Sequence, residues 1–178
     1  NIIKKGLWGL ARHLGFNGGT VLEPAAGIGH IIGLMPLDFA GDVNVIGVEL
    51  DSISGRILKK LYPDAHINVA GFQDVKSIKD NSVDLVISNF PFGNIPIHDK
   101  QHPEYSGWSI HNYFFGRSID SLRPGGMIVT ITSHYTLDSA SNTKMRRTLA
   151  DKADFIGAIR LPRTAFAENA GTEVVTDI

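Results

Sequence analysis

The 178-residue chain has no cysteine, no long apolar run and almost no net charge. Without cysteine it forms no disulfide, no thiolate zinc site and no thiol nucleophile. No stretch approaches the roughly 20 consecutive apolar residues of a membrane-spanning helix, and no apolar segment follows the basic residues near its start, as in a signal peptide. These absences predict a cytoplasmic protein without membrane contact.

The formal net charge of −1 bears on nucleic-acid binding. Phosphate neutralisation dominates affinity for nucleic acids, so a domain that holds DNA by itself is usually basic. We therefore expect any nucleic-acid contact to be confined to one face of the domain or to be provided by another segment.

Length and composition fit one globular domain. Hydrophobic residues make up 43% and charged residues 20% of a chain long enough to bury a substantial core. We find no internal repeat, so residues 1–178 are expected to form a single domain. The chain begins without methionine, and its last apolar run stops at the final residue. It is therefore expected to be a fragment of a longer protein.

Strand and helix patterns alternate from residue 20 onward. Short apolar runs predict strands at residues 20–23, 43–49, 66–70, 83–88, 127–132 and 155–161, and the start of a seventh at 173–178. Helical spacing predicts helices at residues 2–14, 52–62, 108–122 and 139–153. The first helix is expected to pack on the core, and Ser52 to cap the second. This alternation is typical of a doubly wound α/β sheet.

A glycine-rich turn, Glu23-Pro24-Ala25-Ala26-Gly27-Ile28-Gly29, follows the first predicted strand. Such a turn brings backbone N–H groups close to a ligand, and an acid about 20 residues later binds ribose hydroxyls. Glu49 ends the second strand and fits that role. The predicted cofactor-binding residues of these two segments are Glu23, Pro24, Ala25, Gly27, Gly29 and Glu49.

An NAD-binding unit would show the same turn. Two details favour S-adenosylmethionine instead. Ile32 stands where a dinucleotide fingerprint has its third small residue, and an acid at Glu23 is unusual before the glycines of an NAD site.

After the third strand, Gln73 or Asp74 is expected to accept a hydrogen bond from the cofactor adenine while Phe72 packs on its ring. A solvated turn is the alternative.

The segment Asn89-Phe90-Pro91-Phe92 follows the fourth predicted strand. It combines an amide side chain, a backbone carbonyl that precedes a rigid proline, and an aromatic face. An aromatic amine is a poor nucleophile because its lone pair is delocalised into the ring. The Asn89 side-chain oxygen and the Phe90 carbonyl are expected to accept both amine hydrogens and so localise that lone pair, while Phe92 stacks on the ring.

These motifs together resemble the adenine-N6 methylase module of restriction-type DNA methyltransferases and of helicase–methylase fusions. The resemblance covers residues 14–178 and includes further segments: His111-Asn112-Tyr113-Phe114-Phe115, Leu122-Arg123-Pro124-Gly125-Gly126, Ile159-Arg160-Leu161-Pro162 and a tail from Phe166 through Gly171-Thr172-Glu173 to Thr176-Asp177-Ile178. The family motif is Asn-Pro-Pro-aromatic or Asp-Pro-Pro-aromatic. Phe90 replaces its first proline, which removes one of two residues that rigidify the turn.

The resemblance implies a doubly wound, mostly parallel, seven-stranded Rossmann-like methyltransferase sheet with helices on both faces. It implies methyl transfer from S-adenosylmethionine to adenine N6 in DNA, with the target base flipped into the site. In this family a separate segment recognises the DNA sequence, and a segment before the first strand completes the cofactor pocket; neither is expected in these residues. Methylation of ribosomal RNA or protein glutamine, and a non-catalytic cofactor- or DNA-binding module, remain alternatives.

Three further groups of residues are weaker candidates. The polar loop 93–107 is expected to cover the acceptor pocket. His98 and His102 lie in that loop without a third ligand nearby in sequence, so no metal site is predicted. Phosphate contacts or ordinary exposed charge explain a group of basic residues about equally well: Lys144, Arg146, Arg147, Arg160 and Arg163.

Overall fold

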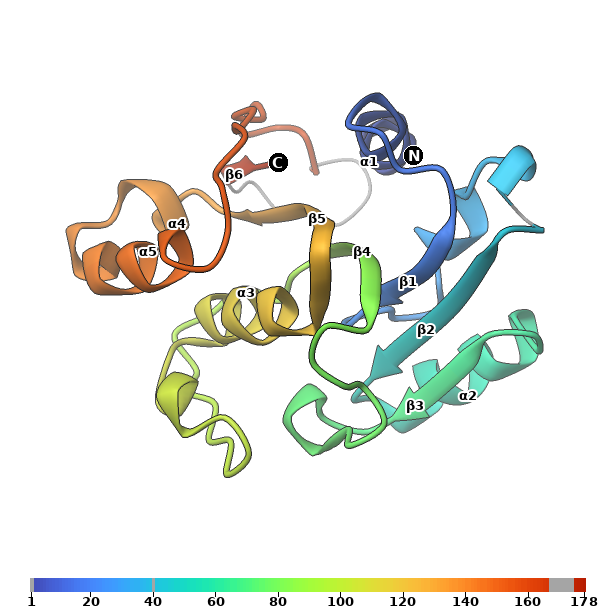
Figure 1. Ribbon diagram of the computed structural model, residues 1–178, viewed down its shortest axis with the longest axis horizontal. Helices are drawn as coiled ribbons and strands as arrows, with labels where there is room; N and C mark the ends of the chain where they lie inside the picture. Colours follow the sequence, from blue (N-terminus) through green and yellow to red (C-terminus); the bar gives the residue numbers. More distant parts are fainter. Residues whose placement is uncertain (1, 40, 167–174) are drawn as a thin grey trace.

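The computed structural model describes residues 2–39, 41–166 and 175–178. A six-stranded sheet runs through it in the order β3-β2-β1-β4-β5-β6. Its strands are β1 (Gly19–Glu23), β2 (Val43–Glu49), β3 (His66–Val69), β4 (Val83–Asn89), β5 (Leu122–Ser133) and β6 (Thr176–Asp177). All neighbouring pairs are parallel except β5 and β6, which are antiparallel. The predicted doubly wound, mostly parallel sheet is confirmed (Figure 1).

Helices cover both faces of this sheet. The α-helices are α1 (Ile2–His13), α2 (Ser52–Leu61), α3 (Ile110–Ser121), α4 (Tyr135–Asp138) and α5 (Thr143–Ala150). Short 3-10 turns are η1 (Ile32–Leu34), η2 (Leu37–Phe39), η3 (Phe72–Asp74), η4 (Pro103–Tyr105) and η5 (Ala140–Asn142). None of the described helices is both long and apolar enough to cross a membrane.

Alternating side chains divide the core into two layers. Leu85 and Ile87 of β4 pack in one cluster with Trp8 of α1. Val86, between them, packs on the other face with Tyr113 of α3. These strand residues are fully buried because helices cover both faces. On the α1 side, Leu58 of α2 forms a third, smaller cluster under the outer strands.

The helix boundaries differ from the sequence prediction at two places. The side chain of Asp51, rather than that of Ser52, caps α2 by accepting a hydrogen bond from Ser54 N at 2.8 Å. The single helix predicted at residues 139–153 is shorter, because α5 begins only after the η5 turn, and α4 precedes both.

The strand predicted at residues 155–161 is wrong, and the described sheet has six strands instead of seven. The segment is irregular, and its large apolar side chains, including Phe155 and Ile156, are exposed. It nevertheless lies beside β6: Ile159 N donates to Ile178 O, and Leu161 N to Thr176 O, both at 2.9 Å. It thus borders the open edge of the sheet without a regular ladder. The matched tail residues Gly171, Thr172 and Glu173 lie outside the described residues.

Candidate functional site

The glycine-rich turn after β1 is shaped by packing as well as by backbone conformation. Gly27 and Gly29 have φ angles of 56° and 86°, where side chains other than glycine are strained. A Cβ on Gly29 would lie 2.3 Å from the Tyr62 ring. The Tyr62 hydroxyl also donates to the Gly29 carbonyl at 2.8 Å. The end of α2 therefore holds the turn, and only glycine fits at position 29.

Glu49 supports the same turn from β2. Its carboxylate accepts hydrogen bonds from Gly27 N at 2.7 Å and from Asp51 N at 2.8 Å. Each carboxylate oxygen has a second lone pair, so both remain able to accept a hydroxyl. The structure thus shows Glu49 bracing the turn. That it binds ribose remains a prediction.

Glu23 is the most unusual acid of the site. Its side chain is 2% exposed, and Oε2 has no hydrogen-bond partner among the described residues. Burial raises the pKa of Glu23 well above its ordinary value, and nearby Glu49 acts in the same direction. The backbone of Ile32 and the charge of Lys4 oppose this rise. A buried carboxyl without a partner is costly, and a cationic ligand group would relieve that cost.

Glu23 faces the smaller of two cavities, which has a volume of about 270 Å³. This smaller cavity is lined by Lys4, Glu23, Ala25, Ala26, Gly27, Ile28, His30, Ile31 and Asn89. It therefore brings together predicted cofactor residues and the first residue of the predicted acceptor motif. Pro24 is buried beside the lining, and Gly29 acts through the turn itself.

Two lining residues with ionisable side chains, Lys4 and His30, were not predicted from the sequence. Lys4 comes from α1, which is held in place by a 2.8 Å hydrogen bond from Trp8 Nε1 to Ile31 O. The expectation that no segment before β1 reaches this pocket is therefore wrong. Burial, and then the charge of Lys4, lower the pKa of His30.

The predicted adenine contacts after β3 lie outside this lining. Phe72 is 3% exposed and packs against Tyr113 and Phe114, with ring centroids 6.2 and 5.2 Å away. Its ring is used in the core, so the prediction that it packs on a ligand does not fit the structure. The Gln73 amide donates to the exposed Asp74 carboxylate at 3.0 Å. Their contact with an adenine remains a prediction.

The segment 89–92 contributes to the lining of both the smaller cavity and a second, larger one. Asn89 is exposed at the end of β4 and lines the smaller cavity, whereas Phe92, 39% exposed, lines the larger. Pro91 between them is half-buried. The amide and the exposed aromatic ring of the motif thus line different cavities, one at each end of this segment.

Phe90 anchors the segment in two ways. Its ring is 1% exposed and lies 5.6 Å from Phe114 and 5.0 Å from Phe115 between centroids, both edge-on. Its N–H donates to Ile131 O of β5 at 3.0 Å, a bond that proline cannot make. At position 90, aromatic packing and a backbone hydrogen bond therefore fix the segment in place of the rigid proline ring of the motif that it resembles.

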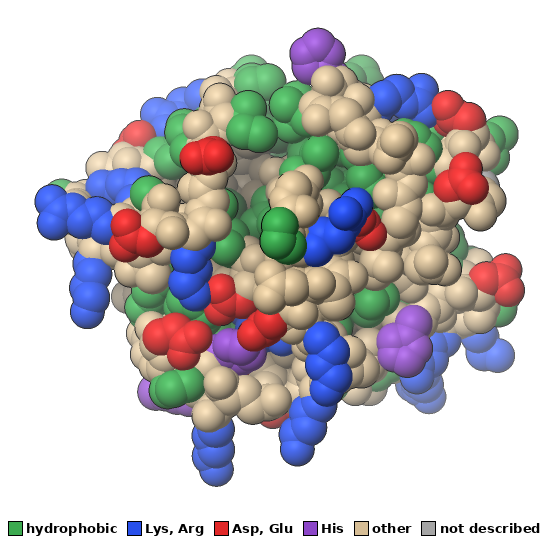
Figure 2. Space-filling view, in the orientation of Figure 1, with side chains coloured by type: hydrophobic (Ala, Val, Ile, Leu, Met, Phe, Trp, Pro, Cys, Tyr) green, Lys and Arg blue, Asp and Glu red, His purple; other side chains and the backbone are tan. Residues whose placement is uncertain are grey.

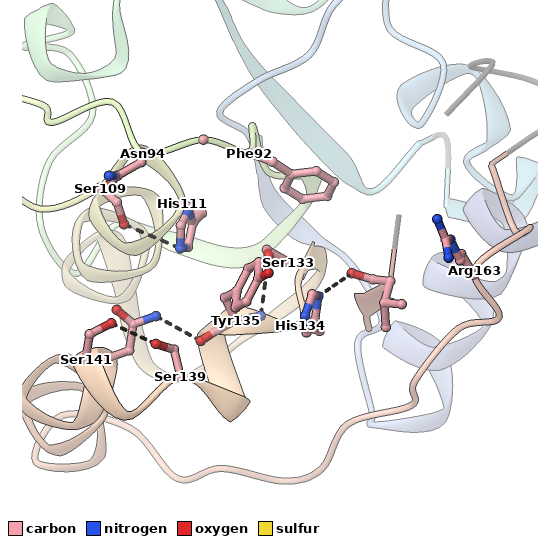
Figure 3. Close-up of a pocket in the computed structure, with 13 residues that line it drawn as sticks. Phe92, Asn94, Ser109, His111, Ser133, His134, Tyr135, Ser139, Ser141 and Arg163 are labelled. Atoms are coloured by element: carbon pink, nitrogen blue, oxygen red, sulfur yellow. Dashed lines mark hydrogen bonds between the residues drawn. The ribbon is translucent and has the colours of Figure 1, made fainter. Parts of the chain in front are cut away.

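The larger cavity has a volume of about 750 Å³ and is shown in Figure 3. It is lined by Phe92, Gly93, Asn94, Ser109, His111, Ser133, His134, Tyr135, Ser139, Ser141, Asn142, Arg163 and Val175. In the view of Figure 3 the Phe92 ring lies above the Tyr135 ring, with His111 to one side and Arg163 on the other. The lining combines aromatic faces, hydroxyls and basic groups, and no carboxylate is among these residues.

Most of the long polar loop does not cover this cavity. Only Gly93, Asn94 and Ser109, at or next to its ends, line it. The middle is tied to α3: the buried Asp99 accepts from the Tyr113 hydroxyl at 2.6 Å, and Tyr105 is fully buried. The predicted cover is therefore wrong for the middle of the loop.

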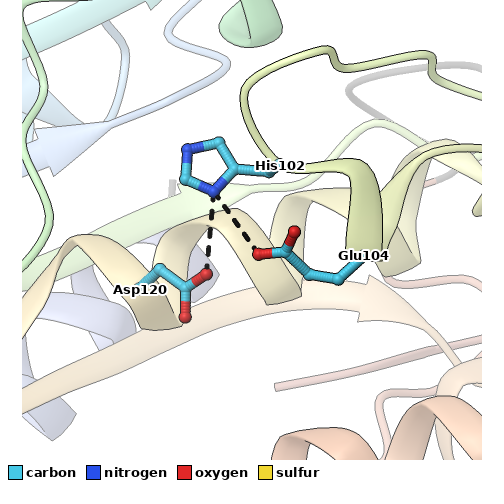
Figure 4. A group of neighbouring side chains, drawn as sticks. All are labelled: His102, Glu104 and Asp120. Atoms are coloured by element: carbon cyan, nitrogen blue, oxygen red, sulfur yellow. Dashed lines mark ion pairs between the residues drawn. The ribbon is translucent and has the colours of Figure 1, made fainter.

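His102 in that loop lies near two acids, Glu104 and Asp120 (Figure 4). One potential ligand atom from each lies within 4.8 Å of the others. Asp120, however, already accepts from the Tyr105 hydroxyl at 2.8 Å and from Lys152 Nζ at 2.7 Å. Asp120, which the sequence did not reveal as a neighbour of His102, is thus the ion-pair partner of Lys152. His98 instead lies near the Ser106 hydroxyl.

The predicted phosphate-binding residues separate into two groups. Arg146 donates to the carbonyls of Thr136 and Ser139 at 3.1 and 2.8 Å, so it holds the turn after α4. Arg160 pairs with Asp177 and Asp138. Lys144 and Arg147 are exposed on α5, and Arg163 lines the larger cavity. On the face shown in Figure 2, basic side chains are scattered over the left, centre, bottom and right of the surface, with acids between several of them.

Solved structures share this architecture. A Listeria monocytogenes protein assigned as a candidate class I S-adenosylmethionine-dependent methyltransferase superposes with a TM-score of 0.74 at 19% identity, over 99% of this chain and 57% of that one. The chain has the class I methyltransferase fold. Pyrococcus horikoshii TYW2 in complex with MeSAdo superposes with a TM-score of 0.61 at 13% identity, over 99% of this chain and 60% of that one.

One curated relative extends the comparison at the level of sequence. The chain is 33% identical over 180 residues to the defence against restriction protein B of Escherichia phage P1. The match covers 99% of this chain but 8% of that protein, so the chain spans a small part of its relative. No protein-family model matches the chain.

Proposed function

We propose that this chain is the catalytic domain of an S-adenosylmethionine-dependent DNA methyltransferase that acts on adenine N6. One observation carries the proposal: the segment 89–92 lies between the two cavities, with Asn89 lining the smaller and Phe92 lining the larger. A transfer between two ligands requires such an arrangement, because the donor and acceptor atoms must be aligned within van der Waals reach.

The smaller cavity suits the cofactor. Glu23 offers a buried carboxyl whose Oε2 has no partner among the described residues, and Lys4 offers a positive charge at the same cavity. The methionine part of S-adenosylmethionine carries an ammonium and a carboxylate, which complement these two groups. When bound, this cofactor supplies an electrophilic methyl group on a sulfonium. Glu49 and the Gly27 backbone are proposed to hold its ribose end.

Asn89 and Phe90 are proposed to activate the acceptor amine. Two hydrogen bonds, to the Asn89 side-chain oxygen and the Phe90 carbonyl, would draw the nitrogen lone pair out of the aromatic ring. The anchoring of Phe90 to Ile131 and to the Phe114 cluster fixes the position of that carbonyl. Phe92 then supports the flat base from the larger cavity.

DNA is the proposed substrate on two grounds. The lining of the larger cavity includes Arg163 and two histidines but no carboxylate, which favours a polyanion. The phage P1 relative is named for defence against restriction, and restriction enzymes act on DNA. Sequence recognition is proposed to lie outside these residues, because the described basic side chains form no single patch on the face shown in Figure 2.

Methylation with tritiated S-adenosylmethionine tests the proposal. Unmethylated plasmid DNA, ribosomal RNA and a translation release factor are offered in parallel, to this chain and to its full-length natural protein. We expect label in DNA alone, recovered as N6-methyladenine after digestion to nucleosides. Label in RNA or in glutamine of the protein would overturn the choice of acceptor.

A non-catalytic module is the competing function. Titration calorimetry with S-adenosylmethionine separates the two, since the proposed function requires cofactor binding. Absence of binding by the full-length protein would favour the non-catalytic module.

A further inference from the structure

Most polar groups around the larger cavity already have partners. The ring nitrogen Nδ1 of His134 lies 2.9 Å from Val175 O. The hydroxyls of Ser139 and Ser141 pair with each other at 2.7 Å. The Asn142 amide donates to Tyr135 O at 2.9 Å, and its oxygen accepts from Asn112 at 2.9 Å. These bonds shape the wall and leave few groups free to bind a ligand.

His111, the second residue of α3, differs from these neighbours. It is 8% exposed, and its Nδ1 has no well-formed hydrogen bond to any described residue. Its Nε2 lies 3.4 Å from the Ser109 hydroxyl, a long contact (Figure 3). A buried ring nitrogen without a well-formed hydrogen bond is costly, and a ligand group that bonds to the ring would remove that cost.

The charge state of His111 fits hydrogen bonding to a neutral ring. Burial lowers the pKa of His111, although its interaction with the Gly93 backbone opposes this. A neutral imidazole still has one donor nitrogen, and the ring nitrogens N1 and N7 of adenine accept hydrogen bonds, so His111 can donate to the base edge while both amine hydrogens go to Asn89 and Phe90. The cavity also holds His134, Tyr135 and Arg163, but no acid in its lining stabilises an imidazolium there.

His111 also lies beside the acceptor motif. Gly93 immediately follows Phe92, and its backbone interacts with the His111 ring. A flat group that packs on Phe92 in this cavity would therefore turn one edge toward α3. His111 is the most buried polar side chain in that wall.

We infer that His111 binds the edge of the flat acceptor that packs on Phe92 and thereby selects the acceptor base. This inference rests on the proposed function and adds to it a residue that discriminates among acceptors. A site built to hydrogen-bond a substrate rejects analogues that leave its buried polar group unpaired. The rival role for His111 is a brace for Gly93 that never touches the acceptor.

Two substitutions separate these roles. His111→Leu removes both ring nitrogens, whereas His111→Gln keeps a donor and an acceptor. We expect His111→Leu to lower kcat/KM for DNA about 10- to 100-fold and to leave the affinity for S-adenosylmethionine, measured by calorimetry, within about twofold. His111→Gln should recover most of the loss. The exposed His98, which lines neither cavity, supplies the control His98→Leu.

Unchanged kcat/KM for DNA in His111→Leu would overturn the inference. So would an equal loss in His111→Gln and His111→Leu together with weaker cofactor binding, because a brace would affect both cavities. If His111→Leu does not fold, as judged by thermal melting, His111→Gln and the nuclear magnetic resonance measurement described next decide between the two roles of His111.

Nuclear magnetic resonance of the imidazole of His111 provides a readout without turnover. The probes are adenosine and inosine, each added with S-adenosylhomocysteine present. Inosine has a carbonyl in place of the exocyclic amine and carries a proton on N1, which in adenosine is an acceptor. We expect a saturable shift of the His111 signals with adenosine and a smaller one with inosine. If DNA is not methylated but adenosine shifts His111, the proposed function fails and the inference stands. If neither nucleoside shifts His111, the inference fails, whatever the methylation assay shows.

Discussion

The two cavities on either side of segment 89–92 are built from different kinds of residues. The smaller cavity is made by strand ends and the glycine turn, and its strongest feature is an acid, Glu23, buried without a full set of partners. The larger is made by loops and helix starts, with aromatic rings, hydroxyls and no acid in its lining. The difference indicates that the two cavities select different ligands. The smaller cavity suits a charged ligand through electrostatics, and the larger suits a flat ligand through shape and hydrogen bonds to its edge.

Replacing Phe90 with proline tests whether the segment between the cavities needs its present anchors. We expect Phe90→Pro to lower the free energy of unfolding by about 3–5 kcal/mol, because the ring packing and the bond to Ile131 O are both lost. Urea unfolding measures this. The matched variant Phe90→Leu keeps the N–H and should lose about 1.5 kcal/mol. Equal losses in both would show that the N–H bond contributes nothing.

Replacing Asn89 with alanine tests whether the two cavities cooperate. We expect the rate of methyl transfer to fall about 100- to 1,000-fold, the usual result of removing one group that stabilises the developing charge. Cofactor affinity should change less than about threefold, since Asn89 contributes only one side chain to the lining of the smaller cavity. Single-turnover kinetics and calorimetry measure the two effects. Full activity of the variant would refute the role of Asn89.

Glu23→Gln sharpens the electrostatic side of the comparison. The amide has nearly the same shape as the acid but no charge, so we expect affinity for S-adenosylmethionine to fall about 10- to 100-fold. Affinity for DNA should stay within about twofold, because Glu23 does not line the larger cavity. A variant that binds the cofactor as tightly as the original protein would show that Glu23 is not its partner.

The difference in stability between Glu23→Gln and the original protein should depend on pH. Burial raises the pKa of Glu23, so the folded state retains its proton more strongly than the unfolded state does. The stability gained this way is present below the ordinary carboxyl pKa and is lost as pH rises through the raised pKa. We expect ligand-free Glu23→Gln to become relatively more stable as pH rises, by about 1 kcal/mol at neutral pH. Thermal melting from pH 4 to pH 8 measures it. A constant difference would contradict the assignment.

The smallest effects concern the basic residues near the larger cavity. Arg146→Ala should lower stability by about 1 kcal/mol, because Arg146 holds the turn after α4. Lys144→Ala, two residues away on the same helix and exposed, should change stability by less than about 0.5 kcal/mol. It should instead reduce the salt dependence of DNA binding by about one unit of slope. A reduced salt dependence of DNA binding in Arg146→Ala, together with a loss of stability in Lys144→Ala, would instead show that Arg146 binds phosphate.

The sheet was largely predictable because apolar runs, prolines and glycine turns mark its strands locally. The exception, residues 155–161, shows why local pattern is insufficient. Phe155 and Ile156 have the composition of a buried strand, but this segment lies at the open edge of the described sheet, where their side chains stay exposed. Whether the apolar side chains of residues 155–161 are buried depends on which elements pack beside this edge of the sheet. The sequence of the segment alone does not specify those elements.

The candidate site was predictable in its backbone and less so in its side chains. The sequence placed Glu23 and Asn89 at the carboxyl ends of strands, and they meet because β1 and β4 are neighbours. Phe72 was predicted to face the cofactor, but its ring packs in the core against Tyr113 and Phe114. The side chain of one residue in a short turn can face the ligand or the core, and these two contacts lie some forty positions later in the sequence. Lys4 was missed because the apolar stripe of its helix reveals packing but not which polar residue faces the glycine turn.

The hydrogen bond from Trp8 to Ile31 gives the molecule an intrinsic optical reporter. The chain has two tryptophans, and Trp8 donates its indole N–H to a residue that lines the smaller cavity. Trp108 packs instead on Tyr105, with ring centroids 5.0 Å apart, in the loop tied to α3. Filling the smaller cavity should therefore alter the emission of one tryptophan and leave the other as an internal reference. Cofactor titrations can then be followed by unlabelled fluorescence, with Trp108→Phe isolating the responsive signal.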